Sequence, residues 1–147
     1  MKIDNRAVFH DYTILSQIEA GVKLTGPEVK SAKMGHVSLK GAFVKIIGSE
    51  LYLVNAQIQP YTFARVESYD PGRTRKLLIR KHEAESLKTK IDSQGLSLVP
   101  LSMYIKHGLI KVEIGLARGK KQFEKREAIK KRDQLRELSR SYRKKVT

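Results

Sequence analysis

The last thirty residues restrict what this 147-residue chain can fold into more than any other stretch does. Residues 118–147 carry thirteen Lys or Arg against four acids, a net charge of +9, and the first 117 residues hold the other +6 of the total of +15. Like charges this dense repel one another, so the segment needs a polyanion or solvent around it. The sequence therefore predicts a compact domain over residues 1–117 and a basic tail over residues 118–147.

Composition limits the partners of such a chain. Apolar residues make up 40% of the sequence, enough for one modest core, and the high pI of about 10.1 indicates RNA, DNA or an anionic membrane surface as partner. A membrane is the weakest choice, because no apolar run approaches the roughly 20 residues of a spanning helix and the start has no signal-peptide segment. Cysteine is absent, so no disulfide or thiolate metal site is expected, and we expect a cytoplasmic protein.

Turn and strand residues divide the front part of the chain into short elements. Gly48-Ser49 suits a tight hairpin turn, and Asp70-Pro71-Gly72-Arg73 suits a type II turn. We expect strands that begin near Asp11 and that cover residues 42–47, 51–54, 74–80, 96–105 and 109–116, with helices over 26–34 and 82–91. Strands and helices do not alternate, so the pattern favours a mainly β fold: a small antiparallel barrel of the oligonucleotide-binding type with short flanking helices.

The tail has helical composition from Gln122 onward. It contains no Gly or Pro after that point, and Ala128, Leu135, Leu138 and Tyr142 form a thin apolar stripe. This stripe is too narrow to dock firmly on a core. We therefore expect a segment that is disordered alone and becomes helical on its partner.

Motifs for catalysis or metal binding fail at the positions that matter. His82-Glu83-Ala84-Glu85-Ser86 begins like a zinc-protease helix but has Ser86 where the second histidine is required. Residues 115–121 resemble a phosphate-binding loop but lack its glycine spacing and its hydroxyl after lysine. The histidines show no metal-ligand spacing, so we expect no enzyme, no metal and no cofactor.

Basic residues near turns and in the tail are the candidates for binding. Arg73, Arg75 and Lys76 follow a rigid turn and could hold phosphates, although a solvated strand end is an equal alternative. Phe123 and Tyr142 could stack on unpaired bases, and Tyr142 could equally complete the helix stripe. Glu19 repels phosphate, so chemistry alone favours a plain surface charge there. The tail cations are arranged in three steps: Lys120-Lys121, Lys125-Arg126 and Lys130-Lys131-Arg132.

Motifs spread over nearly the whole chain resemble one known family. Each piece is weakly specific, but their order and spacing together are highly specific. The chain resembles the SsrA-binding proteins, or small protein B, of bacterial trans-translation. The matching pieces are Asn5-Arg6, His10-Asp11-Tyr12, Glu19-Ala20-Gly21, residues 24–31, residues 69–78, residues 111–115, and Gly119-Lys120-Lys121 with Lys125-Arg126.

The resemblance implies a specific role. In the family, an oligonucleotide-binding-type barrel holds the tRNA-like domain of transfer-messenger RNA, and the two together enter the vacant A site of a stalled ribosome. The basic tail follows the empty mRNA channel and folds into a helix. The implied partners are transfer-messenger RNA, the small-subunit RNA of the ribosome, and elongation factor Tu on the same RNA.

The resemblance also implies site residues. Asn5, Glu19, Leu78 and Lys111 correspond to family residues that bind the RNA, and Arg6, His10, Arg73, Arg75 and Lys76 are further candidates. Gly119, Lys120, Lys121, Lys125 and Arg126 correspond to the motif that engages the decoding centre, with Phe123, Lys130, Lys131, Arg132 and Tyr142 beside it in the tail.

This chain departs from the family pattern in two places. Ala7-Val8-Phe9 stands where the family often has more arginine, and Phe123 stands where a histidine is frequent. Fewer cations before His10 could weaken RNA affinity or shift contacts elsewhere. Phenylalanine can still stack on a base, but it cannot donate a hydrogen bond.

Two other functions compete with this interpretation. A structural ribosomal protein or a generic RNA-binding module would also be small, basic and tailed, and selective affinity for one structured free RNA separates the hypotheses. An RNA-processing enzyme is a third, weaker hypothesis that requires turnover without added factors.

Overall fold

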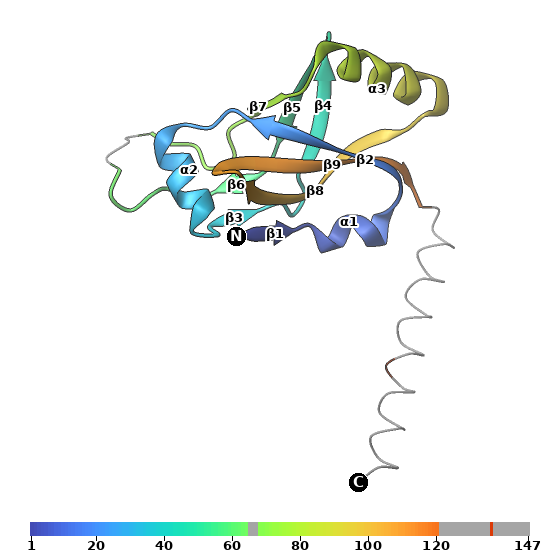
Figure 1. Ribbon diagram of the computed structural model, residues 1–147. Coiled ribbons are helices and arrows are strands. Elements are labelled where there is room, and N and C mark those ends of the chain that lie inside the picture. Colours follow the sequence, from blue (N-terminus) through green and yellow to red (C-terminus); the bar gives the residue numbers. More distant parts are fainter. Residues whose placement is uncertain (65–67, 121–135, 137–147) are drawn as a thin grey trace.

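The computed structural model describes residues 1–64, 68–120 and 136. The described part is mainly antiparallel β structure with three helices, arranged as Figure 1 shows. In chain order the elements are β1 (Lys2–Asp4), α1 (Arg6–Asp11), β2 (Tyr12–Val22), α2 (Gly26–Lys33), β3 (Val37–Ser38), β4 (Phe43–Ile47), β5 (Glu50–Val54), β6 (Gln57–Ile58), β7 (Arg75–Leu78), α3 (Lys81–Gln94), β8 (Ser97–Lys106) and β9 (Leu109–Gly119).

The main sheet closes on itself. Its strand order is β1-β8-β4-β5-β7-β2-β9, and β9 also pairs with β8, so the strands from β8 to β9 form a closed ring and β1 is added at β8. All of these pairs are antiparallel. The closure is weakest between β4 and β8, which share a single registered pair, Val44 with Leu98. The prediction of a mainly β antiparallel fold with short helices is confirmed.

Most strands bury one face in the main core, and Val8, Val99, Leu101 and Ala117 form a second, smaller cluster. Along β9, Ile110, Val112 and Ile114 are buried, whereas Lys111 and Glu113 alternate with them and are only partly buried. This alternation follows from the two-residue period of a strand. The three helices lie around the barrel: α2 at one end of the β2–β9 pair, α1 toward the other end, and α3 beyond the ends of β4 and β5 (Figure 1).

Helix α2 begins as its sequence predicts. The Thr25 hydroxyl accepts a hydrogen bond from the Glu28 N–H, and the Glu28 carboxylate accepts one from the Thr25 N–H, which together form a capping box. Pro27 lies in the first turn, where its missing N–H is harmless, and Gly35 follows the helix with φ +81°. Local chemistry therefore fixes both ends of this helix.

The turns are partly as predicted. β4 and β5 pair across Gly48-Ser49 with Ile47 opposite Glu50, as a two-residue hairpin requires. The type II prediction for residues 70–73 was wrong, because Gly72 does not have positive φ. Instead, the Asp70 carboxylate accepts from the Gly72 N–H at 2.9 Å, and the Arg73 N–H donates to the Asp70 carbonyl at 3.2 Å.

The N-terminal part and several element ends differ from the prediction. The strand expected from Asp11 starts at Tyr12, continues to Val22 and is preceded by β1 and α1, which the sequence did not predict. β1 is three residues long and is held by pairing with β8, and α1 is only six residues long. Such short elements carry too little periodicity to stand out in a sequence. β9 continues to Gly119, two residues past the expected domain boundary.

The β8–β9 turn offers a test of this fold. His107 and Gly108 both have positive φ, +51° and +76°, so Gly108→Ala places a Cβ on a left-handed backbone. We expect a loss of about 1 kcal/mol in the free energy of unfolding, measured by urea denaturation. Gly26→Ala is the matched control. Gly26 does not have positive φ, and the space around it is open, so this variant should be as stable as the unchanged protein. Equal effects of the two changes would contradict the turn geometry.

Candidate nucleic-acid interface

Residues far apart in the sequence meet on the outer face of the barrel. Gly21 of β2 stands opposite Leu78 of β7 on one side and Lys111 of β9 on the other. Lys111 stands in turn opposite Tyr104 of β8. Together with Glu19 on β2 and Lys106 on β8, these residues form one surface from four strands. We call this surface the barrel patch: Glu19, Gly21, Leu78, Tyr104, Lys106 and Lys111.

Gly21 lets its neighbours come close together. A Cβ at this position would lie 3.3 Å from the Leu78 Cβ and 3.7 Å from the Lys111 Nζ. Leu78 is 51% exposed, which is unusual for a leucine in the centre of a sheet. The barrel patch therefore presents an exposed apolar side chain beside a cation.

Glu19 is held in place by hydrogen bonds. The Tyr104 hydroxyl donates to Glu19 Oε2, and Lys106 Nζ lies 3.4 Å from both carboxylate oxygens. The bond from Tyr104, followed by Lys106 and the charge of Lys111, lowers the pKa of Glu19. Burial and the negative charge of Glu19 raise the pKa of Tyr104, so its phenol stays protonated and keeps donating.

The barrel patch can bind a structured polyanion. Its lysines can bind phosphates, Leu78 can pack on a base or sugar, and Glu19 can accept from a base amino group or orient Lys106. Tyr104 and Lys106 were missed by sequence reasoning. The hairpin at residues 107–108 with the two-residue strand period would have placed Tyr104 opposite Lys111, but nothing in the sequence shows that β2 pairs with β9.

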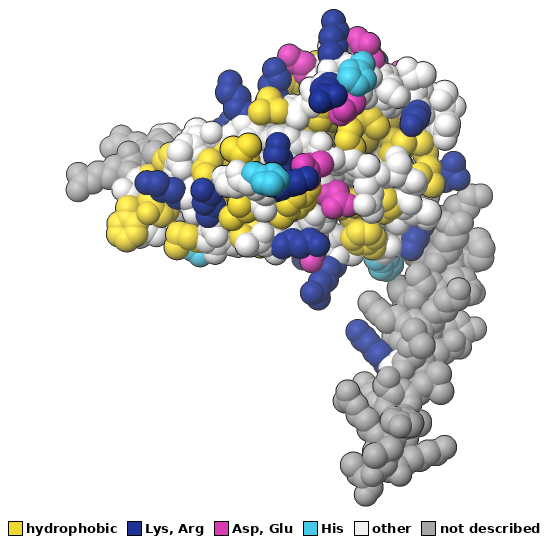
Figure 2. Space-filling view, viewed as in Figure 1, with side chains coloured by type: hydrophobic (Ala, Val, Ile, Leu, Met, Phe, Trp, Pro, Cys, Tyr) yellow, Lys and Arg dark blue, Asp and Glu magenta, His cyan; other side chains and the backbone are white. Residues whose placement is uncertain are grey.

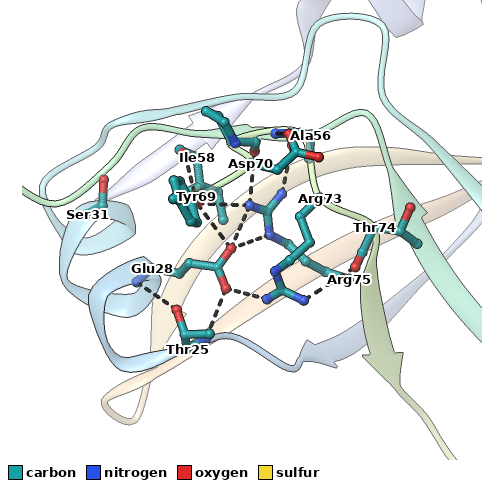
Figure 3. Close-up of polar contacts among 12 residues, drawn as sticks. Thr25, Glu28, Ser31, Ala56, Ile58, Tyr69, Asp70, Arg73, Thr74 and Arg75 are labelled. Carbon is teal, nitrogen blue, oxygen red and sulfur yellow. Dashed lines mark hydrogen bonds and ion pairs between the residues drawn. The ribbon is translucent and has the colours of Figure 1, made fainter. Parts of the chain in front are cut away.

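A buried ion cluster lies between the start of α2 and the start of β7 (Figure 3). The Glu28 carboxylate is fully buried and accepts hydrogen bonds from Arg73 and, at 2.7 Å, from Nε of Arg75. The Arg75 side chain is also fully buried and donates to the carbonyls of Ala56 and Pro71 and to the hydroxyl of Tyr69. The cluster ties α2, the segment after β5 and the start of β7 together.

The charge of Glu28 is stabilised by its partners. Burial alone would raise the pKa of this carboxyl, but the hydrogen bonds from Arg73, the Thr25 N–H and Arg75 outweigh it and lower the pKa to about 2. A buried carboxylate with this many donors is fully satisfied. Glu28 was not a candidate at the sequence level, where it was assigned only to the start of a helix.

Arg73, Arg75 and Lys76, the basic residues predicted as one cluster after the turn, therefore lie in different environments. The Arg75 side chain is fully buried. Its phosphate contact stays a prediction, and it would require the hydrogen bonds of the ion cluster to break. Arg73 is 39% exposed although it bonds Glu28, and Lys76 pairs with Glu50 at 3.0 Å on the surface. Arg73 and Lys76 are accessible, and their phosphate contacts also stay predictions.

The N-terminal candidates lie at the other end of β2. Asn5 is buried, donates from Nδ2 to the Pro100 carbonyl at 2.9 Å and donates from its backbone to Leu101, so it fastens the N-terminus to β8. Arg6 is exposed on α1, and Nδ1 of the half-buried His10 lies 3.8 Å from Asp11 Oδ1.

The first tail candidates join this N-terminal group. Gly119 stands opposite Tyr12, and Lys120 donates from Nζ to the Phe9 carbonyl at 3.0 Å and from its backbone to Asp11. The structure thus divides the described candidates among the barrel patch, the region of Arg73, Arg75 and Lys76 at the start of β7, and a group around α1. The other tail predictions lie outside the described residues: the helix from Gln122, Lys121, Phe123, Lys125, Arg126, Lys130, Lys131, Arg132 and Tyr142.

Other kinds of site are not found in the part of the chain that the structure describes. Over residues 1–64, 68–120 and 136, no group of three or more His, Asp or Glu side chains could hold a metal ion. Within the same ranges, no helix is long and apolar enough to span a bilayer.

A closed antiparallel barrel that presents lysines and an exposed leucine on its outer face, together with a basic tail, defines a small β-barrel protein of the nucleic-acid-binding class. The chain belongs to the SmpB family, whose model, described as "SmpB protein", matches residues 2–144. The resemblance inferred from the sequence motifs is confirmed.

Curated relatives and a solved structure agree with this assignment. The SsrA-binding proteins of Syntrophotalea carbinolica and Geobacter metallireducens are 47% and 48% identical over 140 residues, which cover 95% of this chain and 93% and 92% of theirs. The SsrA-binding protein of Streptococcus suis is 47% identical over 137 residues, 93% of this chain and 88% of its own. A solved structure described as "tmRNA-SmpB: a journey to the center of the bacterial ribosome" matches with a TM-score of 0.67 and 47% identity, covering 82% of this chain and 85% of the other.

Glu28→Gln tests the buried cluster. It leaves Arg75 buried without its counter-charge, and we expect the free energy of unfolding near neutral pH to fall by about 3–5 kcal/mol. The exposed pair gives the control, because Glu50→Gln removes only a solvent-screened ion pair and should change the free energy of unfolding far less. Urea denaturation followed by circular dichroism measures both changes.

The pH dependence of stability tests the same charge. The folded-state pKa of about 2 lies below the ordinary 4.5, so the stabilisation from Glu28 is present above pH 4.5 and is lost as the pH falls toward 2. Glu28→Gln should therefore have a shallower loss of stability than the unchanged protein over this range. Parallel curves for the two proteins would contradict the assignment.

Tyr104→Phe tests the geometry of the barrel patch. Removing the hydroxyl removes the largest cause of the lowered pKa of Glu19, so that pKa should rise toward 4.5 in a carboxyl NMR titration. Tyr52→Phe is the matched control, because Tyr52 is the first cause of the lowered pKa of Glu50 and should shift that residue alone. An unchanged pKa of Glu19 in Tyr104→Phe would show that the hydrogen bond does not form in solution.

Proposed function

We propose that this protein binds the tRNA-like domain of transfer-messenger RNA with its barrel and delivers that RNA to the A site of stalled ribosomes for trans-translation. The observation that carries the proposal is the convergence of Glu19, Leu78 and Lys111 on one surface. These residues lie on three strands separated by up to ninety-two positions of sequence, and each matches a family position implied in RNA binding.

The chemistry of the barrel patch supports selective binding. Lys106 and Lys111 attract any phosphate backbone, which by itself gives affinity without selectivity. Glu19 is charged and fixed, so it repels a phosphate but accepts from a base amino group in the right place. An RNA whose shape brings a base edge to Glu19 and phosphates to the lysines is favoured over other RNA.

The tail is proposed to act at the ribosome. Residues 1–117 form the RNA-binding domain and residues 118–147 the basic tail, although β9 continues to Gly119 and Lys120 is still bonded to α1. The chain therefore leaves the barrel at the end opposite to α2 (Figure 1). Two separated binding regions suit a protein that holds one RNA while it enters a second particle. The residues proposed for the decoding centre and the mRNA channel are Gly119, Lys120, Lys121, Phe123, Lys125, Arg126, Lys130, Lys131, Arg132 and Tyr142.

The proposal includes a setting and further partners. The protein acts in the cytoplasm by binding and catalyses no reaction itself. Elongation factor Tu is a proposed partner on the same RNA. Asn5 contributes by fastening the N-terminus to β8, and Arg6, His10, Arg73 and Lys76 are proposed as outer RNA contacts.

Two variants test the division of labour between barrel and tail. A chain ending at Lys120 should bind the tRNA-like domain of transfer-messenger RNA as well as the full chain but fail to support peptide tagging on stalled ribosomes. Lys111→Ala should bind this RNA roughly 10- to 100-fold more weakly, as expected for a lost charge-assisted bond. In a plot of the logarithm of the binding constant against the logarithm of the salt concentration, its slope should also be shallower by about 0.7 to 0.9. Filter binding and a reconstituted tagging reaction measure these outcomes.

Lys45→Ala is the control for Lys111→Ala, because Lys45 is an exposed lysine on β4, outside the barrel patch. Ordinary tRNA is the competitor, since net charge gives any RNA some affinity. Equal losses for the two lysine variants, or equal competition by ordinary tRNA, would leave a generic cationic binder or a ribosomal protein. Normal tagging by the shortened chain would remove the proposed role of the tail.

A further inference from the structure

An aromatic pocket lies beside α2, away from the barrel patch. It is a cavity of about 330 Å³ whose walls include Pro27, Pro60, Tyr61 and Tyr69. Next to it, Phe63 is 82% exposed, the largest exposure among the big apolar side chains of the described residues. The rings of Tyr61 and Phe63 meet edge to face, with centroids 5.5 Å apart. We call Tyr61, Phe63 and this cavity the aromatic pocket.

Cations surround the aromatic pocket. Lys30 Nζ lies 5.4 Å from the centre of the Tyr61 ring, and the partly exposed Arg73 lines the cavity. Two carboxylates also line it: Glu28, which is buried and bonded by Arg73 and Arg75, and Asp70, whose Oδ1 accepts from the Gly72 N–H. Lys30 and the two arginines together carry one positive charge more than these two carboxylates. Figure 2 shows hydrophobic side chains gathered with Lys and Arg at this end of the molecule.

This combination matches one kind of ligand. The exposed ring of Phe63, with Lys30 and Arg73 nearby, suits a flat base whose neighbouring phosphates are negative. Unpaired bases are the parts of an RNA that can leave their stack and lie on aromatic side chains. Gln59, which also lines the cavity, can bond a base edge.

The aromatic pocket is close enough to the barrel patch for one RNA to reach both. Arg73 and Leu78 are five residues apart, at most about 17 Å along an extended strand. Arg73 bonds Glu28 of α2, and Leu78 stands opposite Gly21, near the end of β2 that leads to α2. Gly119 and Lys120, in contrast, lie beside Tyr12 and α1. A base of the RNA held on the barrel is therefore a better occupant than an RNA reached by the tail.

We infer that the aromatic pocket takes an unpaired nucleobase of the same RNA that the barrel patch binds, stacked on Phe63 beside Tyr61, with Lys30 and Arg73 on the flanking phosphates. The inference rests on the proposed function. It adds a second contact region to the RNA-binding surface and assigns a role to residues of α2 and of the segment after β6.

A tryptophan reporter tests this inference directly. The chain has no Trp, so Phe63→Trp gives a protein whose single indole reports on the pocket. Adding the tRNA-like domain of transfer-messenger RNA should quench its fluorescence as a base stacks on the ring. Phe43→Trp is the matched control: Phe43 is 42% exposed on β4, and its signal should not change. Polarisation of end-labelled RNA confirms binding in both samples.

Affinity gives the second measurement. Phe63→Ala and Tyr61→Ala should each bind this RNA roughly 5- to 100-fold more weakly, the range expected for loss of one stacked base. Phe63→Trp should keep the affinity, and so should Phe43→Ala. Phe63 is exposed, so its removal leaves the core intact, and far-ultraviolet circular dichroism verifies this.

The outcomes separate this inference from the proposed function. If the unchanged protein binds the RNA but Phe63→Ala binds it equally well, or if the Phe63→Trp signal is constant while RNA is bound, the pocket does not take a base and the barrel proposal stands. If Phe63→Ala loses tagging without losing affinity for the RNA, the base belongs to the ribosome and the inference is wrong. If the unchanged protein does not bind this RNA selectively, the proposed function and the inference about the aromatic pocket are both wrong.

Discussion

The buried contact of Glu28 with Arg73 and Arg75 is the interaction on which the arrangement of this protein depends. It joins a helix N-terminus, the segment after β5 and the start of β7, none of which is adjacent to the others in sequence. Ions inside a protein are tolerated only when each is paired and hydrogen-bonded, and here both conditions are met. The same carboxylate closes the capping box of α2, so the start of the helix and the position of β7 are set together.

The position of β7 determines the outer surface of the barrel. β7 pairs with β5 on one side and β2 on the other, and it carries Leu78 to a place opposite Gly21. β2 in turn pairs with β9, which brings Glu19 and Lys111 to the same face. An internal charge cluster and an external charged surface thus lie on the two sides of one short strand. Arg75 is fully buried in the cluster, whereas Arg73 is 39% exposed and Lys106 of the patch is 51% exposed.

The molecule is organised along the β2–β9 pair. The aromatic pocket is lined by residues at the start of α2, and Lys120 is bonded to α1, which lies toward the other end of this pair. Figure 1 shows α2 and α1 at these two ends. This separation gives a physical basis for a protein that binds an RNA with one region while another region engages a different partner. Both regions carry lysines, and the carboxylate of Glu19, held by Tyr104 and Lys106, distinguishes the first.

The sequence by itself determined the features that depend on near neighbours. The capping box of Thr25 and Glu28, the hairpin at Gly48-Ser49, most strands and the charge of the tail all follow from short-range chemistry, and the family motifs pointed to Glu19, Leu78 and Lys111. Only the tertiary structure decided that Arg75 is buried, that Asn5 fastens the chain to β8, and that Tyr104 holds Glu19. Tyr104 and Glu19 are eighty-five residues apart, and Asn5 and Pro100 ninety-five. Contacts over such separations depend on which strands pair, and strand composition does not specify the partner of a strand.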